Sequence, residues 1–324
     1  MKKVVWIDFD PEKLDLSYMV DRFQKEGYDV ITEVIDFENE EEVIRHGLMA
    51  DAVVSQWEKW NARTLEAVKG KLKFIMKFGM GTNNIDIPYA TKVGIPVANI
   101  AGANAASVAE VAFLHILNCG RGFTYCADGG KKGVWPHMHL GNELDGKTVG
   151  LYGLGNIARQ LVRMLAGFQV KILAYDPYIS PATVPEGVEL LSSLEELFQK
   201  SDFVSLHVPY TKETDKSIDV HLFALMKPTA YLVNTCRGGV VNEDDLAEAL
   251  RSGIIRGAGL DVLTEEPPTK DNPLLSMENV TITTHVGANT AESDYRAMVV
   301  IADTIIEYLQ GGQPKNVLNK DVFC

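Results

Sequence analysis

Residues Lys147 to Ala158 read KTVGLYGLGNIA, and this stretch decides the fold of the second half of the chain. An apolar strand leads into the spacing GxGxxA, formed by Gly153, Gly155 and Ala158, and a helical pattern follows. In such a turn the first glycine permits tight bending, the second leaves room for a pyrophosphate, and the small third residue lets helix and strand approach. Phosphate charge then meets the helix N-terminus. The stretch predicts a dinucleotide site, and a glycine-rich turn that binds nothing is the alternative interpretation.

A carboxylate follows the glycine turn about twenty residues later, where Asp176 ends the next predicted strand, VKILAY. At that position a carboxylate can accept hydrogen bonds from the adenosine ribose hydroxyls and would repel a 2′-phosphate. The position therefore favours NAD over NADP. The alternative is an Asp that only shapes the turn before Pro177.

Around this turn the sequence predicts a doubly wound α/β unit. Six candidate strands with helical or irregular segments between them read KTVGLY, VKILAY, DFVSLHV, AYLVNT, GAGLDV and VTITT. Six parallel strands are typical of Rossmann-type folds. One intervening helix has a clear start, because Asn242 can cap it and Asp245 stands three residues later. A helical pattern over about 104–121 precedes the unit, and the Gly- and Lys-rich stretch ADGGKKGVW that follows this pattern predicts a loop.

The first hundred residues alternate helical stretches with five β-rich runs, VVWI, DVITEVI, AVVS, KFIMKF and IPVAN, which predicts a second parallel sheet. A helical pattern from about Thr290 to Gln310 has no strand of its own to follow, so we expect it to pack on this first sheet. The fold class is therefore α/β, with two Rossmann-like or flavodoxin-like parallel-sheet domains and a cleft between them. We expect a discontinuous substrate-binding domain over 1–100 plus 290–324, and an NAD-binding domain over 101–289.

Composition narrows the possible partners of the chain. The 324 residues are 46% hydrophobic and 23% charged, with a formal net charge of −13, so nucleic acid and anionic membranes are disfavoured. Asp8 and Asp10 interrupt the first apolar stretch, and we expect no signal peptide and no membrane span. A cytoplasmic location is expected, because no disulfide or metal-site spacing links Cys119, Cys126, Cys236 and Cys324.

His137 and His139 form an HxH pair downstream of Cys126. A metal site there would need further ligands, and the sequence does not indicate which residues these are. We therefore interpret the pair as loop histidines and expect no metal ion.

Polar side chains stand where four predicted strands of the second unit end: His207, Arg237, Glu266 and His285. Ligands of doubly wound sheets bind at this carboxyl edge. Arg237 suits the carboxylate of a 2-hydroxy acid, and His285 suits the proton of its hydroxyl group. Glu266 would hold His285 in one tautomer and favour its protonated form. Each residue alone has a plainer interpretation, as a surface cation, a core histidine or a loop acid, but together they predict an active site.

The chain resembles the D-isomer-specific 2-hydroxyacid dehydrogenase family in seven stretches that follow one another along the sequence: KFGMGTNNID, ANAASVAE, GKTVGLYGLGNIA, SLHVP, NTCRGGVVNEDDL, GLDVLTEEP and THVGANTAES. The resemblance implies an NAD-dependent oxidoreductase that interconverts a small D-2-hydroxy acid and its 2-keto acid. It implies a catalytic set of Arg237, Glu266 and His285, and a homodimer. It further implies cofactor contacts at Gly153, Gly155, Asn156, Ile157, Asp176, His207, Pro209, Thr214, Thr235, Cys236, Asp261 and Gly287.

The resemblance also implies that backbone amides around Met80 and Gly81 bind the substrate carboxylate, which suits an anion-binding turn after KFIMKF. The loop after AVVS reads SQWEKWN, where phosphoglycerate dehydrogenases of the family usually have an arginine for the substrate phosphate. We expect Gln56 and Trp57 to line the substrate pocket, although Trp57 and Trp60 could equally pack in the core. Two alternatives remain open: a phosphoglycerate dehydrogenase, and a non-enzymatic protein that senses NAD.

Overall fold

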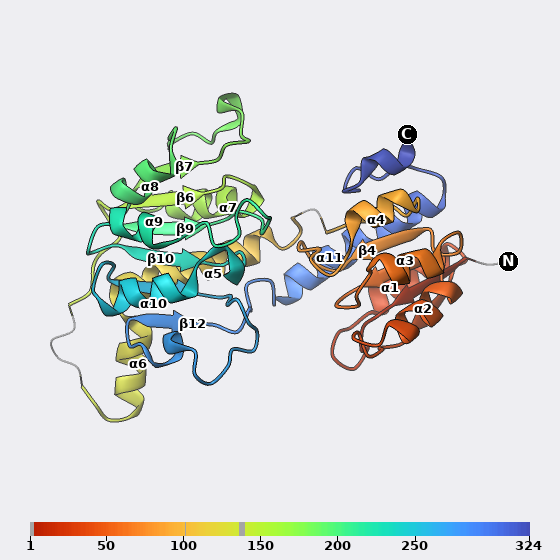
Figure 1. Cartoon of the computed structure of the whole chain (residues 1–324), viewed down its shortest axis with the longest axis horizontal. Coiled ribbons are helices and arrows are strands. Elements are labelled where there is room, and N and C mark those ends of the chain that lie inside the picture. Colours follow the sequence, from red (N-terminus) through yellow and green to blue (C-terminus); the bar gives the residue numbers. More distant parts are fainter. Residues whose placement is uncertain (1–2, 101, 136–139) are drawn as a thin grey trace. The chain divides into compact units, whose positions relative to one another are not determined.

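The computed structural model describes residues 3–100, 102–135 and 140–324 and contains two compact units (Figure 1). Unit 1 comprises Met1–Asn104 and Thr290–Cys324, and unit 2 comprises Ala105–Asn289. The sequence places the first boundary after residue 100, whereas the chain stays in unit 1 as far as Asn104.

Unit 1 is built on a parallel sheet with the strand order β2-β1-β3-β4-β5. Its strands are β1 (Val4–Ile7), β2 (Asp29–Thr32), β3 (Ala52–Ser55), β4 (Phe74–Lys77) and β5 (Val97–Ala98), and all five β-rich runs of the sequence are confirmed. Strands β3 and β4 are buried along their whole length, which explains why they read as continuous apolar runs. The helices are α1 (Ser17–Lys25), α2 (Glu40–Met49), α3 (Ala62–Val68) and α4 (Ile87–Lys92).

The C-terminal helix α11 (Ala291–Leu309) belongs to unit 1, where it packs against α1 and β4. Thr290 begins it by accepting a hydrogen bond from the backbone N–H of Ser293 at 3.1 Å. Its apolar stripe, which includes Ile301 and Ile305, joins the core between the sheet and α1. The helix predicted from Thr290 to Gln310 is confirmed.

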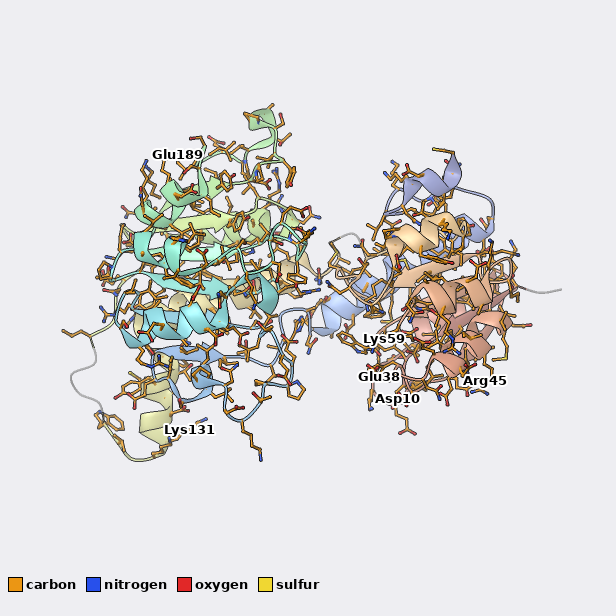
Figure 2. The ribbon with its side chains drawn as sticks, in the orientation of Figure 1. Asp10, Glu38, Arg45, Lys59, Lys131 and Glu189 are labelled. Atoms are coloured by element: carbon orange, nitrogen blue, oxygen red, sulfur yellow. The ribbon has the colours of Figure 1, made fainter. Side chains whose placement is uncertain are left out.

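Unit 2 contains a parallel sheet whose described part has seven strands, in the order β12-β11-β10-β9-β6-β7-β8. They are β6 (Thr148–Tyr152), β7 (Lys171–Tyr175), β8 (Val188–Leu190), β9 (Phe203–Leu206), β10 (Tyr231–Asn234), β11 (Gly257–Leu260) and β12 (Val280–Ile282). The predicted number of six is wrong, because β8 is only three residues long and too short to show an alternating pattern. Its Glu189 (Figure 2) forms an exposed ion pair with Lys171 of β7 at 2.9 Å.

Helices cover both faces of this sheet. One core contains side chains of α5 (Ala105–Arg121) and α7 (Asn156–Leu165). The other contains side chains of α8 (Leu194–Lys200), α9 (Val220–Leu225) and α10 (Glu243–Arg251). Asn242 caps α10 by accepting from Asp245 N at 3.5 Å, as predicted. Short 3₁₀ turns occupy Pro181–Thr183, Gly238–Val240, Pro273–Ser276 and Lys320–Phe323.

The predicted loop ADGGKKGVW is wrong over Ala127–Lys131, because Phe123–Lys131 form helix α6, which extends away from the sheet of unit 2 (Figure 1). The first turn of α6 is held from the preceding helix, because Asn118 Oδ1 of α5 accepts from Thr124 N at 2.8 Å. Two glycines inside the helix mislead a prediction from composition. No side chain in α6 is buried.

Several expectations concern the chain as a whole. Its four cysteines are free thiols in the structure. His137 and His139 lie outside the described residues. Within the described ranges, no cluster of three or more His, Cys, Asp or Glu side chains could hold a metal ion. No helix in those same ranges has the length and apolarity needed to cross a bilayer.

Unit 1 buries charged side chains at the carboxyl edge of its sheet: Asp8 after β1, Glu58 after β3, and Lys77 at the end of β4. Glu58 Oε2 accepts hydrogen bonds from Ser55 Oγ at 3.1 Å and from Gln56 N at 2.6 Å. Burial, and then the charge of Asp8, raise the pKa of Glu58 to about 8. Burial also raises the pKa of Asp8. Glu58 is therefore protonated at neutral pH.

We predict that Glu58→Gln makes the melting temperature less dependent on pH. The folded protein keeps a proton on Glu58 that the unfolded chain releases above its ordinary pKa of 4.5. Stability is therefore lost as the pH rises between 4.5 and about 8. Gln retains both acceptor contacts and has no proton to lose, so its advantage over the parent protein grows towards pH 8. Thermal melts at several pH values check this, with exposed Glu12→Gln as the control, and equal slopes for Glu58→Gln and the parent contradict it.

Candidate functional site

The glycine turn between β6 and α7 has the geometry that the sequence predicts. Gly153 has a φ of 89°, and a Cβ atom placed on it would lie 2.6 Å from the carbonyl oxygen of His207. A Cβ on Gly155 would meet nothing within 4 Å, so this side of the turn is open. Ala158 is fully buried against the strand. The turn thus combines a tight bend with an open face and close helix packing.

Helix α7 begins at this open face and has the features of an anion site. Gly155, its N-cap, has no side chain to satisfy the first N–H groups, and no acidic residue occupies the first turn. The unsatisfied N–H groups and the helix dipole attract a phosphate. Asn156 and Ile157 are the first residues of the helix and carry these groups.

Asp176 serves the turn and remains available to a ligand. Its Oδ2 accepts from Leu154 N at 2.9 Å, inside the glycine turn, and its Oδ1 accepts from Tyr178 N at 2.9 Å. Asp176 therefore does shape the turn before Pro177, as the alternative interpretation states. A carboxylate has about four acceptor sites, so the half-buried group can still accept from ribose hydroxyls.

Two buried polar atoms at the carboxyl edge of the sheet have no hydrogen-bond partner among the described residues: His207 Nδ1, beside the glycine turn, and Thr235 Oγ1, after β10. The other ring nitrogen of His207 lies 2.9 Å from Ser205 Oγ. Burial lowers the pKa of His207 to about 4, so its ring is neutral. Native proteins rarely leave such atoms unsatisfied, and a bound molecule commonly supplies the partner. Together with the glycine cradle, these atoms fit a dinucleotide.

Two other predicted cofactor contacts stabilise their own loops. Thr214 Oγ1 donates to the carbonyl oxygen of Pro209 at 2.7 Å, which closes the loop after β9. The Cys236 thiol is buried and donates to Asn234 Oδ1 at 3.1 Å, and burial raises its pKa to about 11. This thiol therefore stays protonated at neutral pH.

The Asn234 side chain shapes the loop that carries Arg237. Its Oδ1 accepts from Cys236 N at 3.0 Å, and its Nδ2 donates to the Arg237 carbonyl at 2.9 Å. Gly238 then packs so closely that an added Cβ would lie 1.9 Å from the backbone carbon of Leu263. The Arg237 loop is thereby held against the loop that leads to Glu266.

His285 and Glu266 make the contact that the sequence predicts. The distance from His285 Nδ1 to Glu266 Oε2 is 2.7 Å, and both side chains are more than one third exposed. The second oxygen of Glu266 accepts from Leu263 N at 2.9 Å, which orients the carboxylate. Because Nδ1 is engaged with Glu266, Nε2 is the ring nitrogen suited to exchange a proton with a substrate.

Asp261 holds the turn that presents His285. Its buried carboxylate accepts from Thr283 Oγ1 at 2.6 Å, from Val286 N at 2.9 Å and from Gly287 N at 2.8 Å. Its carbonyl oxygen accepts from His285 N at 2.8 Å. His285 has a φ of 55°, a left-handed conformation that costs a residue with a side chain about 1–3 kcal/mol. The four bonds to Asp261 maintain this conformation.

Sequence reasoning missed Asn234, Gly238 and Thr283, because they act through hydrogen bonds or close packing rather than through chemistry of their own. Asn234 had a readable signal, since an Asn at a strand end commonly bonds the backbone two residues later. The contact of Gly238 with Leu263 joins residues far apart in the sequence and leaves no local pattern.

In unit 1 the predicted substrate residues follow β3 and β4. Trp57 is 57% exposed and its ring lies 5.0 Å from Lys77 Nζ, whereas Trp60 is fully buried and donates to Ser55 Oγ at 3.1 Å. Trp60 therefore packs in the core and Trp57 remains accessible. Gln56 follows β3 directly, and its N–H is held by Glu58.

The second group of predicted substrate residues lies in the turn after β4. Gly79 has a φ of 145°, which permits the chain to bend there. Met80 is 39% exposed, and its carbonyl oxygen accepts from Asn99 Nδ2 at 3.1 Å. Gly81 follows Met80 directly, and binding of an anion by the backbone of this segment stays a prediction.

Comparison with known proteins adds to this geometry. Residues 113–287 match the family model described as D-isomer specific 2-hydroxyacid dehydrogenase, NAD binding domain. The chain is 42% identical over 260 residues to a hydroxypyruvate reductase of Thermotoga maritima, a match that covers 79% of this chain and 84% of that protein. The structure also matches the holo form of D-mandelate dehydrogenase from Rhodotorula graminis, with a TM-score of 0.89, 30% identity and 98% coverage of both chains.

A further relative is the D-3-phosphoglycerate dehydrogenase of Methanocaldococcus jannaschii, which is 44% identical over 252 residues. That match covers 77% of this chain and 48% of the relative. This chain therefore spans about half the length of the phosphoglycerate dehydrogenases that it matches.

We predict that Gly153→Ala weakens NADH binding at least tenfold, because the added methyl group meets the His207 carbonyl at 2.6 Å and the φ of 89° disfavours it. Fluorescence titration with NADH measures the dissociation constant. Gly167→Ala is the control, since a Cβ there meets nothing within 4 Å. Equal NADH affinity of the two variants would show that the turn does not contact the cofactor.

Proposed function

Because this chain belongs to the D-isomer specific 2-hydroxyacid dehydrogenase family, we propose that it interconverts a small D-2-hydroxy acid and its 2-keto acid with NAD. The observation that carries the proposal is the 2.7 Å contact between His285 and Glu266 at the carboxyl edge of the NAD binding domain. A histidine held by a carboxylate, with an arginine on a loop at the same edge of the sheet, matches what a 2-hydroxy acid requires.

In the proposed reaction His285 moves the proton. During oxidation Nε2 takes the hydroxyl proton of the substrate, and during reduction it returns that proton to the carbonyl oxygen. Glu266 keeps Nδ1 protonated and stabilises the imidazolium that oxidation forms. NAD, when bound, supplies the hydride acceptor for oxidation and the hydride donor, as NADH, for reduction.

Arg237 pairs with the substrate carboxylate and so places the alpha carbon, because its planar fork can bind both carboxylate oxygens. Asn234 sets the loop conformation of Arg237. In unit 1, we assign substrate contacts to the backbone of Met80 and Gly81 and to the Gln56 and Trp57 side chains. The cleft expected between the two units stays a prediction, as does the homodimer.

The buried charges of unit 1 favour an unphosphorylated substrate. Lys77 interacts with the charge of Asp8 and donates to the Gln56 carbonyl, so its positive charge is already balanced by groups of the protein. A phosphate group carries a charge of about −1.5 to −2, and Lys77 is already engaged with groups of the protein. The 44% identity to a phosphoglycerate dehydrogenase supports the alternative substrate, 3-phosphoglycerate.

A panel of 2-keto acids assayed by NADH absorbance tests the proposal. It contains glyoxylate, hydroxypyruvate and pyruvate, with phosphohydroxypyruvate as the phosphorylated arm. We expect kcat/KM for an unphosphorylated acid to exceed that for the phosphorylated one at least tenfold. A preference for the phosphorylated acid favours the phosphoglycerate alternative. NADH binding without turnover of any acid contradicts an enzymatic role and favours an NAD-sensing protein.

We predict that His285→Ala lowers kcat by about 10²- to 10⁴-fold, the usual contribution of a general acid–base residue. Steady-state kinetics with the best acid of the panel measure the effect. NADH affinity is the control and stays unchanged, because the variant leaves the glycine turn intact. Full turnover by the variant would exclude His285 as the proton carrier.

Arg237→Lys is expected to raise KM for the keto acid more than it lowers kcat. Lysine keeps the charge but loses the planar fork that binds both carboxylate oxygens. The same kinetic assay measures both constants, and an unchanged KM would show that Arg237 does not bind the carboxylate.

We predict that the parent protein prefers NADH over NADPH and that Asp176→Ala weakens this preference. The carboxylate beside the glycine turn would face the 2′-phosphate of NADPH. The ratio of kcat/KM for the two cofactors measures it. Equal turnover of both cofactors by the parent protein would refute the assignment of Asp176.

A further inference from the structure

The buried side chain of His115 contacts Thr283, two residues before His285. His115 lies in α5, in the apolar stripe that also contains Val108 and Ala112, and is 2% exposed. Its Nε2 lies 3.0 Å from Thr283 Oγ1, just after β12. The neighbouring strand is shaped to admit the ring, because a Cβ on Gly259 of β11 would lie 2.8 Å from His115 Cβ. Because burying a polar ring is costly, the place that Gly259 leaves for His115 indicates a specific role for the contact between His115 and Thr283.

The number of protons available on each group fixes which group donates in the contacts among His115, Thr283 and Asp261. Thr283 has one hydroxyl proton, and its oxygen lies 2.6 Å from Asp261 Oδ1, which also accepts from Val286 N. The Thr283 proton therefore goes to Asp261, and the Thr283 oxygen must accept from His115. Burial lowers the pKa of His115, against the opposing effect of the Asp261 charge, so the ring is neutral with its single proton on Nε2.

The chain of donors continues into the candidate active site. His115 donates to Thr283, and Thr283 donates to Asp261. Asp261 in turn accepts from the backbone of His285 and Gly287. Without the His115 donor, the Thr283 oxygen loses one of its two contacts, and Asp261 Oδ1 is then oriented by a less firmly held hydroxyl group.

We propose that His115 is a positioning residue, which fixes the Thr283 hydroxyl on Asp261 and thereby holds the turn that presents His285. The inference rests on the proposed function for its catalytic consequence, but its structural content concerns residues of unit 2 alone. His115 touches neither the reacting atoms nor the glycine turn, so its effect on the reaction passes through Asp261.

The structure offers a matched control in the same strand. Thr281 in β12 accepts from Asn118 Nδ2 of α5 at 2.8 Å, just as Thr283 accepts from His115 two residues later. Each threonine thus accepts a hydrogen bond from a polar side chain of α5. Of the two, only Thr283 also donates to Asp261. Thr281→Val and Thr283→Val therefore remove equivalent hydroxyl groups, and a general loss of packing would affect both alike.

The experiment compares His115→Leu, His115→Gln, Thr283→Val and Thr281→Val in the full chain. Amide hydrogen exchange at residues 285–287 is measured first, without any substrate. We expect faster exchange there in His115→Leu and Thr283→Val, and no change in Thr281→Val. His115→Gln should exchange more slowly than His115→Leu, because the Gln side-chain amide can replace the Nε2–H donor.

Kinetics with the best keto acid form the second readout. We expect His115→Leu and Thr283→Val to lower kcat about tenfold with a smaller change in KM, since a misplaced His285 weakens mainly the transition state. Parent-like exchange at 285–287 in both variants overturns the proposal, and so does faster exchange with an unchanged kcat. If the parent turns over no keto acid, the proposed function fails, while exchange still decides whether His115 holds the turn.

Discussion

The candidate site depends on the buried carboxylate of Asp261. A buried carboxylate needs several donors, and Asp261 obtains them from a turn at the end of β12. The same bonds keep His285 in a left-handed conformation that it would otherwise avoid. If this acceptor were lost, the turn could relax and the imidazole would no longer face Glu266. One desolvated charge therefore determines where the candidate proton carrier lies.

The rest of unit 2 brings these groups to one edge. Strands β9 to β12 are parallel neighbours, so the residues that follow them, from His207 to His285, collect at the carboxyl edge of the sheet. Close packing then fixes the loops, as Gly238 shows by leaving no room for a side chain beside Leu263. The glycine turn after β6 stands at the same edge and leaves an open face for phosphate.

The sequence predicts those parts of the structure that local patterns encode. Parallel strands buried on both faces appear as apolar runs, and the Gly153 turn and Asn242 cap have recognisable spacing. Strand β8 was missed because three residues are too few to show a period. Helix α6 was missed because its first turn is held by Asn118 of another helix. Likewise, nothing local distinguishes exposed Trp57 from buried Trp60, or shows that His115 reaches Asp261 through Thr283.

The central claim is that hydride passes between NAD and the alpha carbon of a 2-keto acid, with the acid held by this arrangement of residues. Reduction with NADH deuterated at C4 tests it directly, by mass spectrometry and chiral analysis of the product. The account predicts one deuterium atom at C2 of the hydroxy acid and the D configuration alone. Product without deuterium at C2 from either C4-labelled form of NADH, or a racemic product, would contradict it.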